Sequence, residues 1–428
     1  MHLRHQRYIY CPNTNTLYNK EIKDTYLEHV ENRRVHFEDI PLDRDSIKAN
    51  IGKTRQIIFE ASQGCGMACR YCIYNDNIYR FTRKPGPLNI DFHTAQKAID
   101  LLYTYIGHRE KKELSVGFYG GEPLINFKEI KRIVEYSKSK FKDWNLIFTI
   151  TTNATMLDEE NMQFLIENRF KTLISLDGPR ENHDAKRVYA DGSGTFDDVV
   201  KNLERLKELN PAYYKEYIHF SIVYSKDLSL RSLFDFFNTN GLVNQNHSNL
   251  GYITEANSSY YDHYKYDVRT LRKERKGIFA DILKKAKAKI ELSSIETNFT
   301  VDLAILKKNL DTRKFNILSG ACCFDERLFI SADGKFHICE KINDTFSFGD
   351  VETGFDFSQM ADIAREYVDI IKTNCLDCEI RFLCMRCYAN FTKNSYFELD
   401  RTFCENNAYT VRKMLEELIR LEEAGYSP

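Results

Sequence analysis

The chain has 428 residues, of which 43% are hydrophobic and 29% are charged, and 61 Lys plus Arg balance 62 Asp plus Glu to a net charge of −1. This composition excludes a disordered chain, and it provides no overall basic field that would collect nucleic acid or an anionic membrane. There is no apolar run long enough for a membrane helix and no apolar stretch after the charged start that would make a secretory signal, so we expect a cytoplasmic protein.

The segment RYIYC-PNTNT-LYNKEI, within residues 1–53, predicts a β-hairpin. From residue 54 the sequence alternates between short apolar runs and segments with helical periodicity. Strands are expected at 54–62, 113–119, 146–152, 171–177, 217–225 and 249–255, and helices at 94–109, 127–141, 159–169, 196–209 and 230–239. Strands that are each followed by a helix predict a parallel sheet. We therefore expect an α/β fold with a partial (β/α)6 TIM-like barrel over residues 54–255; a doubly wound sheet is the alternative.

The rest of the chain is expected to form two further parts. Residues 256–320 are charged and helical, which predicts a helical bridging region. Residues 321–428 are rich in cysteine and short of long elements until a closing helix at 408–424, and RLFISADGKFHIC predicts a β-hairpin that turns at Asp333–Gly334. A small domain with so little apolar periodicity needs metal to be ordered.

The twelve cysteines are the unusual feature of the composition, since disulfides are rare in the cytoplasm and clustered thiols there usually hold metal. Cys65, Cys69 and Cys72 form a C-x3-C-x2-C pattern directly after the first barrel strand. A four-iron cluster that is bound by three cysteines leaves one iron open to an exogenous ligand. A zinc site with a remote fourth ligand and buried structural thiols are the alternatives. Cys11 lies far from the other cysteines, as a lone thiol with a packing role.

This loop, with the aromatic Tyr71 before its last cysteine, resembles that of the radical S-adenosylmethionine (radical SAM) enzymes. Further motifs of that family match at the ends of successive strands, namely Gly120-Gly121-Glu122-Pro123, Thr151-Thr152-Asn153, and Ser175-Leu176-Asp177-Gly178 followed by His183-Asp184, Arg187 and Gly192-Ser193-Gly194-Thr195-Phe196. The last run resembles the subgroup that modifies peptides and proteins. Each motif alone is also explained by a helix cap, a turn or a surface charge, but α/β barrels keep their chemistry at these strand ends.

The resemblance implies S-adenosylmethionine as cofactor and a [4Fe–4S] cluster on the three loop cysteines. The open iron would chelate the amino and carboxylate groups of the cofactor, and one electron would release a 5′-deoxyadenosyl radical. The Gly-Gly-Glu motif would meet the methionine ammonium, and Ser175 and Arg187 would contact the ribose and the carboxylate. The implied cofactor-binding residues are Tyr71, Gly120, Gly121, Glu122, Asn153, Ser175 and Arg187.

The C-terminal cysteines resemble the SPASM domain of radical SAM peptide maturases, which carries two auxiliary iron–sulfur clusters. The resemblance implies three [4Fe–4S] clusters in all. Cys322 or Cys323, together with Cys339 and Cys387, would bind the first auxiliary cluster, and the second would be bound by Cys375, Cys378, Cys384 and Cys404. Since neighbouring side chains of an extended chain point in opposite directions, the first auxiliary cluster is expected to have three protein ligands and an open iron. The spacing x2 between Cys384 and Cys387 departs from the x3 of many relatives, and a zinc ribbon stays open as an alternative.

The runs CMRCYAN and HICEKIN resemble maturases of ribosomally made peptides, with thioether-forming members the nearest. This implies a precursor peptide with a leader as substrate, an intramolecular crosslink as product, and an electron donor such as flavodoxin or ferredoxin as partner; neither nucleic acid nor membrane is expected as a partner. Residues 1–53 are either a leader-binding element or an extension that caps the barrel. Two other functions stay open: an anaerobic sulfatase-type maturase, which oxidises Ser or Cys to formylglycine, and a non-catalytic iron–sulfur or zinc binding protein.

Overall fold

The computed structural model describes residues 3, 7–19, 36–37, 41–74, 86–253, 255, 258–312, 314–315, 324, 326–341, 344–393 and 395–428. Its main sheet has eight strands in the order β12-β11-β4-β5-β6-β7-β8-β9. The barrel strands are β4 (Gln56–Ser62), β5 (Glu113–Gly120), β6 (Asn145–Thr152), β7 (Lys171–Ser175), β8 (Ile218–Tyr224) and β9 (His247–Tyr252). All six pair in parallel and in chain order, which confirms the partial barrel and not the doubly wound sheet.

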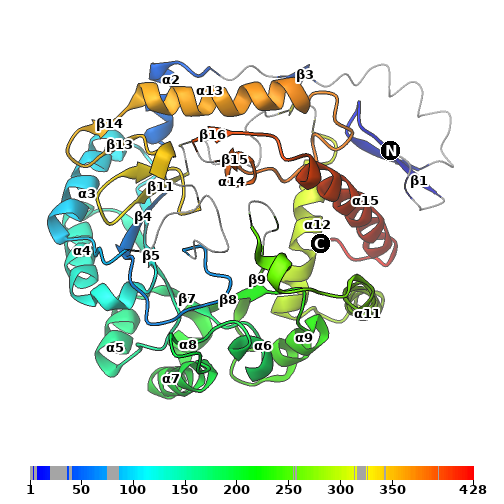
Figure 1. The fold of residues 1–428 in the computed structure, drawn as a ribbon, viewed down its shortest axis with the longest axis horizontal. Coiled ribbons are helices and arrows are strands. Elements are labelled where there is room, and N and C mark those ends of the chain that lie inside the picture. Colours follow the sequence, from blue (N-terminus) through cyan, green and yellow to red (C-terminus); the bar gives the residue numbers. More distant parts are fainter. Residues whose placement is uncertain are drawn as a thin grey trace.

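Helices cover the outer face of this curved sheet and leave its inner face toward the centre of the molecule (Figure 1). They are α3 (Phe92–Ile106), α4 (Phe127–Lys140), α5 (Glu159–Glu167), α6 (Arg180–Asp184), α7 (Phe196–Leu209), α8 (Pro211–Tyr217) and α9 (Leu230–Thr239). The first of them shows why the pattern is readable from sequence. The Asp91 side chain accepts a hydrogen bond from the Thr94 amide at the start of α3, and the buried residues recur at helical spacing, from Ala95 to Ile106.

The predicted hairpin at 327–339 is confirmed, and its first strand also pairs with the barrel sheet. Strand β11 (Arg327–Ile330) pairs antiparallel with β12 (Phe336–His337), and Gly334 has a φ of +83° in the turn between them. On its other side β11 pairs in parallel with β4, with Leu328 opposite Ile57. The cysteine-rich segment therefore extends the barrel sheet at the edge strand that leads into the first cysteine loop.

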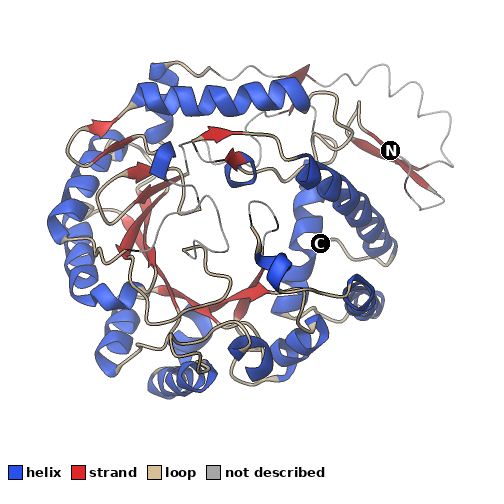
Figure 2. Cartoon of the chain, viewed as in Figure 1, coloured by secondary structure: helices blue, strands red, loops and turns tan. Residues whose placement is uncertain are grey.

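The bridging region is helical as expected, with α10 (Tyr260–His263), α11 (Val268–Lys287) and α12 (Ser294–Asn309). The expectation that residues after 321 lack long elements before 408 is wrong, because α13 (Phe357–Asn374) is an 18-residue helix. Its buried positions, from Phe357 to Ile371, follow helical spacing. The closing helix α15 (Arg401–Glu423) begins earlier than expected, since the Asp400 side chain accepts a hydrogen bond from the Phe403 amide. Figure 2 shows α13 and α15 along the side of the molecule that the barrel strands leave open.

The remaining elements are short. They are α2 (Arg44–Ile51), β3 (His36–Phe37) paired in parallel with β10 (Lys314–Phe315), β13 (Gly349–Asp350) with β14 (Gly354–Phe355), α14 (Tyr388–Phe391), β15 (Thr392–Lys393) with β16 (Tyr396–Phe397), and the 3-10 turns Pro123–Asn126 and Asp344–Phe346. Among the described residues, no helix is both long and apolar enough to span a membrane.

The predicted N-terminal hairpin is confirmed as β1 (Tyr8–Cys11) paired antiparallel with β2 (Thr16–Asn19). Asn15 in its turn docks it on the end of α12. The Asn15 side-chain amide donates to the Asn309 carbonyl at 2.6 Å and to the Thr312 hydroxyl at 2.9 Å, and the Asn15 carbonyl accepts from the Asp311 amide at 2.8 Å. Cys11 is buried within the hairpin, as a packing role requires.

Candidate active site

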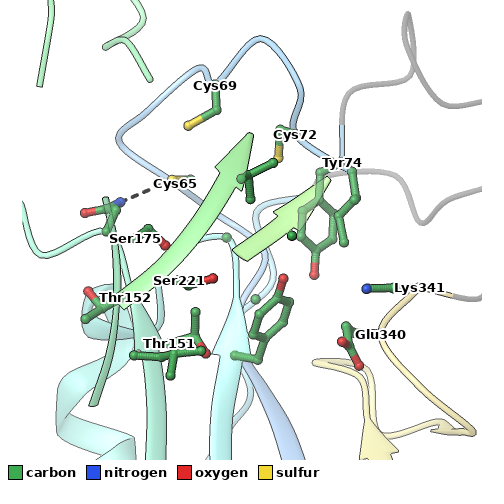
Figure 3. Close-up of a pocket in the computed structure, with 18 of the residues that line it drawn as sticks. Cys65, Cys69, Cys72, Tyr74, Thr151, Thr152, Ser175, Ser221, Glu340 and Lys341 are labelled. Carbon is green, nitrogen blue, oxygen red and sulfur yellow. Dashed lines mark hydrogen bonds between the residues drawn. The ribbon is translucent and has the colours of Figure 1, made fainter. Parts of the chain in front are cut away.

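A cavity of about 1370 Å³ occupies the interior of the barrel. The cysteine loop that follows β4 closes one part of it, and Glu340 and Lys341 of the cysteine-rich segment line another part (Figure 3). Cys387 of the same segment also lines the cavity. Besides Cys387, nine of the expected site residues line this cavity: Cys65, Cys69, Tyr71, Cys72, Gly120, Gly121, Asn153, Ser175 and Arg187. The structure therefore brings together motifs that lie on five different segments of the chain.

The three loop sulfurs receive polar contacts that suit a negatively charged centre. The Cys65 sulfur accepts from the Met67 amide at 3.4 Å and from the Asn153 side-chain amide at 3.7 Å. The Cys69 sulfur accepts from the Arg187 guanidinium at 3.8 Å. Burial raises the pKa of all three thiols, that of Cys69 to about 12, so the thiolate form needs a cation. An iron–sulfur cluster supplies that cation, and the donor set therefore fits one.

The Gly120-Gly121 pair at the end of β5 lies directly against the backbone that leads into the cysteine loop. The Gly121 amide donates to the Ser62 carbonyl, and the Glu122 amide donates to the Gly64 carbonyl, both at 2.8 Å. A Cβ atom on Gly121 would lie 2.3 Å from the Gly64 carbonyl oxygen. Glycine is thus required here because two backbones meet without room for a side chain.

Glu122 of the same motif faces away from the cavity and is fully buried. Its carboxylate accepts hydrogen bonds from the Thr152 hydroxyl at 2.7 Å, the Asn153 amide at 2.8 Å and the Leu124 amide at 3.1 Å. Burial raises the pKa of this carboxyl, although the three hydrogen bonds oppose the shift. In this structure the side chain holds the end of β6 in place, and its expected contact with the cofactor stays a prediction.

Asp177 is a site residue that the motif analysis left without a role. It is 3% exposed, and one carboxylate oxygen accepts from Arg187 Nε at 2.8 Å and from the Tyr71 hydroxyl. The other oxygen accepts from the Val223 amide at 2.8 Å. Asp177 therefore connects two groups to strand β8: Tyr71 of the cysteine loop, and the Arg187 guanidinium that lies beside Cys69. Its place in the Ser175-Leu176-Asp177-Gly178 motif was the only signal in the sequence.

The structure also gathers four C-terminal cysteines. Burial, and after it the neighbouring thiols of Cys384, Cys378 and Cys404, raise the pKa of Cys375 to about 11. The Cys384 sulfur accepts from the Asn407 side-chain amide at 3.0 Å. No group of three or more His, Cys, Asp or Glu side chains is arranged to hold a single metal ion in the part of the chain that the structure describes.

Of the cysteines expected to bind the first auxiliary cluster, the structure describes two. Cys387 lines the cavity, and Cys339 is buried at the end of the β11–β12 hairpin, where its charge acts on Tyr119 of the cavity wall. Cys322 and Cys323 lie outside the described residues, so their ligand roles stay predictions.

Comparison with known proteins agrees with this geometry. The radical SAM superfamily model matches residues 59–231. The radical SAM cyclopropyl synthase TigE of Paramaledivibacter caminithermalis is 30% identical over 254 residues, which cover 57% of this chain and 48% of TigE. A cysteine-type anaerobic sulfatase-maturating enzyme of Clostridium perfringens is 30% identical over 157 residues, which cover 36% of this chain and 40% of that enzyme. The match to this chain thus spans about half the length, or less, of these curated relatives.

Two solved structures share the fold. Native anSMEcpe with bound AdoMet and a peptide superimposes with a TM-score of 0.62 at 19% identity and covers 87% of this chain and 99% of that one. Streptococcus suis SuiB bound to the precursor peptide SuiA has a TM-score of 0.50 at 16% identity, over 90% and 88% of the two chains. Radical SAM enzymes use S-adenosylmethionine and a [4Fe–4S] cluster. With the three-cysteine loop, the barrel and the matched family model together, residues 59–231 of this chain form a radical SAM domain.

Proposed function

We propose that the chain is a peptide maturase that installs an intramolecular crosslink, a thioether, in a ribosomally made precursor peptide. The cavity carries this proposal, because Cys65, Cys69 and Cys72 line one part of it and Cys387 of the cysteine-rich segment lines another. A substrate bound there lies between the cofactor loop and the C-terminal cysteines. The peptides in the structures of SuiB and anSMEcpe support a peptide as substrate.

In this proposal the three loop cysteines bind the [4Fe–4S] cluster, and the cavity around Asn153, Ser175 and Arg187 receives S-adenosylmethionine. When bound, this pair of cofactors supplies a 5′-deoxyadenosyl radical that removes a hydrogen atom from the substrate. The chain's own residues position one substrate C–H bond and exclude water. Ring closure to a cysteine sulfur then also releases the thiol proton and one electron, so an electron acceptor is required.

We propose two auxiliary [4Fe–4S] clusters as the acceptor of this electron. Cys375, Cys378, Cys384 and Cys404 would bind one, since their thiols act on one another across a half-buried space. Cys339 and Cys387, together with Cys322 or Cys323, would bind the other. A flavodoxin or ferredoxin is the proposed electron donor.

A sulfatase-type maturase is the second candidate. The identity of 30% over 157 residues with the Clostridium perfringens enzyme supports it. That reaction would convert a Ser or Cys of a protein into formylglycine.

Iron analysis tests the cofactor assignment. Protein that is reconstituted without oxygen should hold about 12 iron and 12 sulfide. A variant with Cys65, Cys69 and Cys72 changed to Ala should lose about a third of the iron and all cleavage of S-adenosylmethionine. Cys11→Ala is the matched control and should lose neither. Stoichiometric zinc in protein purified without oxygen would contradict the auxiliary clusters.

Product analysis tests the reaction. The reduced enzyme is incubated with S-adenosylmethionine and the short peptide encoded beside its gene. Each thioether should lower the peptide mass by about 2 Da and remove one alkylatable thiol. A carbon–carbon crosslink gives the same mass change but leaves every thiol alkylatable. A loss of about 18 Da from a cysteine would indicate formylglycine and the second candidate.

A further inference from the structure

The inner face of the barrel has a basic floor. Because strand side chains alternate between faces, every second residue of each strand points into the cavity. On β7, β8 and β9 the first of these residues are Lys171, His219 and His247, and all three line the cavity. They stand at the amino ends of their strands, at the opposite end of the cavity from the cysteine loop. Three cationic or hydrogen-bonding side chains, Lys171, His219 and His247, therefore form this basic floor.

The three side chains form one group. His219 and His247 are register partners on neighbouring strands, and their rings lie 5.6 Å apart between centroids. Lys171 lies diagonally across from His219, since Thr172 is paired with Ile218. Burial, His247 and Lys171 lower the pKa of His219, so that at neutral pH its ring is an uncharged donor and acceptor beside the Lys171 charge.

The group has no acidic partner among the described residues. Lys171 and His247 make no hydrogen bond or ion pair within the described part of the chain, and His219 Nδ1 is buried without a hydrogen-bond partner. The one carboxylate among the described cavity-lining residues is Glu340 on the cysteine-rich wall, and it faces Arg327 at 3.8 Å. Side chains that donate hydrogen bonds and carry charge, with no partner of their own, are suited to bind an anion.

The middle of the barrel leaves a path from this floor to the cofactor end. A closed α/β barrel fills its interior with bulky branched side chains. Here the next inward residues of β8 and β9 are the small or polar Ser221 and Asn249, and both line the cavity. Ser175 lies four positions after Lys171 on β7, a distance of about 13 Å at the rise of a β-strand. An extended peptide of about four residues has the same length.

We propose that Lys171, His219 and His247 bind a carboxylate of the peptide substrate, about four residues from the residue that reacts. This inference rests on the proposed function, and it names a chemical class of substrate: a peptide with an acidic side chain or a free C-terminus at that distance. The lysine supplies the charge, and the imidazoles supply N–H donors.

Direct binding measurements test whether the basic floor binds a carboxylate. They use three labelled probes, each an acetylated octapeptide of alternating Ser and Gly with an uncharged dye. The first contains one Asp and an amidated end, the second has Asn in place of Asp, and the third has neither but ends in a free carboxylate. Fluorescence anisotropy under anaerobic conditions gives the affinity of the reconstituted full chain for each. The Asp probe or the free-acid probe should bind about three- to tenfold tighter than the Asn probe. The winning probe identifies the source of the carboxylate.

Variants test whether Lys171, His219 and His247 cause the preference for the probe that carries a carboxylate. The triple change Lys171→Met, His219→Gln, His247→Gln should abolish it, and Lys171→Arg should keep it because the charge remains. The control, Lys142→Met with His93→Gln and His108→Gln, removes the same residue types from exposed positions outside the cavity lining and should keep the preference. Equal binding of all three probes to the wild type would overturn the inference, as would a preference that survives the triple change. Binding is read without turnover, so a failure to cleave S-adenosylmethionine would count against the proposed function alone.

Discussion

The buried carboxylate of Asp177 holds the Arg187 guanidinium in place beside the cysteine loop. Arg187 Nε lies 2.8 Å from Asp177 Oδ2, while Nη1 of the same guanidinium lies 3.8 Å from the Cys69 sulfur. Both side chains are less than a tenth exposed. An ion pair in this setting is costly to break, because the remaining charge stays buried without its partner.

Changing Asp177 to Asn should therefore weaken the binding of S-adenosylmethionine more than tenfold, because Arg187 loses the group that orients it. Equilibrium dialysis with the reconstituted protein measures the affinity. Asp227→Asn is the control, since it breaks another ion pair, with Lys186 at 2.6 Å. That variant should lose stability but bind the cofactor like the wild type. Equal cofactor binding by Asp177→Asn and the wild type would refute the orienting role.

Changing Gly121 to Ala should displace the cysteine loop, because the added Cβ atom meets the Gly64 carbonyl oxygen at 2.3 Å. We expect loss of the iron bound by the three loop cysteines and a destabilisation of about 1–3 kcal/mol. Gly66→Ala is a control in the same loop, since nothing lies within 4 Å of the Cβ position there. Iron content and thermal unfolding check both. A Gly121→Ala protein with full iron would show that the contact can relax.

His183 should make the stability depend on pH. It is fully buried, its Nδ1 accepts from the Asp177 amide at 3.3 Å, and burial and Arg187 lower its pKa well below 6.5. The unfolded chain binds a proton as the pH falls through 6.5, whereas the folded chain does not. As the pH is lowered from 6.5, the free energy of unfolding should therefore decrease by about 1.4 kcal/mol per pH unit.

Urea unfolding at pH 7 and pH 5.5 measures this slope. His183→Gln should remove that part of the pH dependence, and His108→Gln, at an exposed position, should leave it unchanged. A wild-type slope that persists in His183→Gln would assign the proton to another group.

Arg386 should tune the auxiliary cluster that we propose for Cys375, Cys378, Cys384 and Cys404. It is 1% exposed, donates to the Arg381 carbonyl at 3.1 Å, and lowers the pKa of Cys384 and Cys375 against the effect of burial. Removing a buried positive charge disfavours the reduced, more negative cluster. Arg386→Gln should lower a midpoint potential by on the order of 60 mV for a one-electron couple.

Electron paramagnetic resonance during a redox titration measures the potential. Arg386→Lys keeps the charge and should stay near the wild-type value. If Arg386→Gln has full iron and an unchanged potential, the guanidinium serves packing alone.

Much of the barrel was predictable from sequence, since the inward and outward alternation of β8 and the helical spacing of α3 are local patterns. The loop cysteines were predictable as well, because their spacing is compact. Three features were missed. Helix α13 has helical spacing from Phe357 to Ile371, but it lies between Cys339 and Cys375, and the whole segment was interpreted as a small domain that metal holds together. The contact of Glu122 with the end of β6 and the meeting of Lys171 with His219 depend on sheet register, which no local pattern contains.

The pairing of β11 with β4 also has a consequence for synthesis. The two strands are neighbours in the sheet, yet almost the whole barrel lies between them in the chain. Until the ribosome has released β11, β4 presents an open strand edge directly before the Cys65 loop. The pairing of β11 with β4 can therefore close the strand edge at which the first metal ligands begin only after the whole barrel has been synthesised.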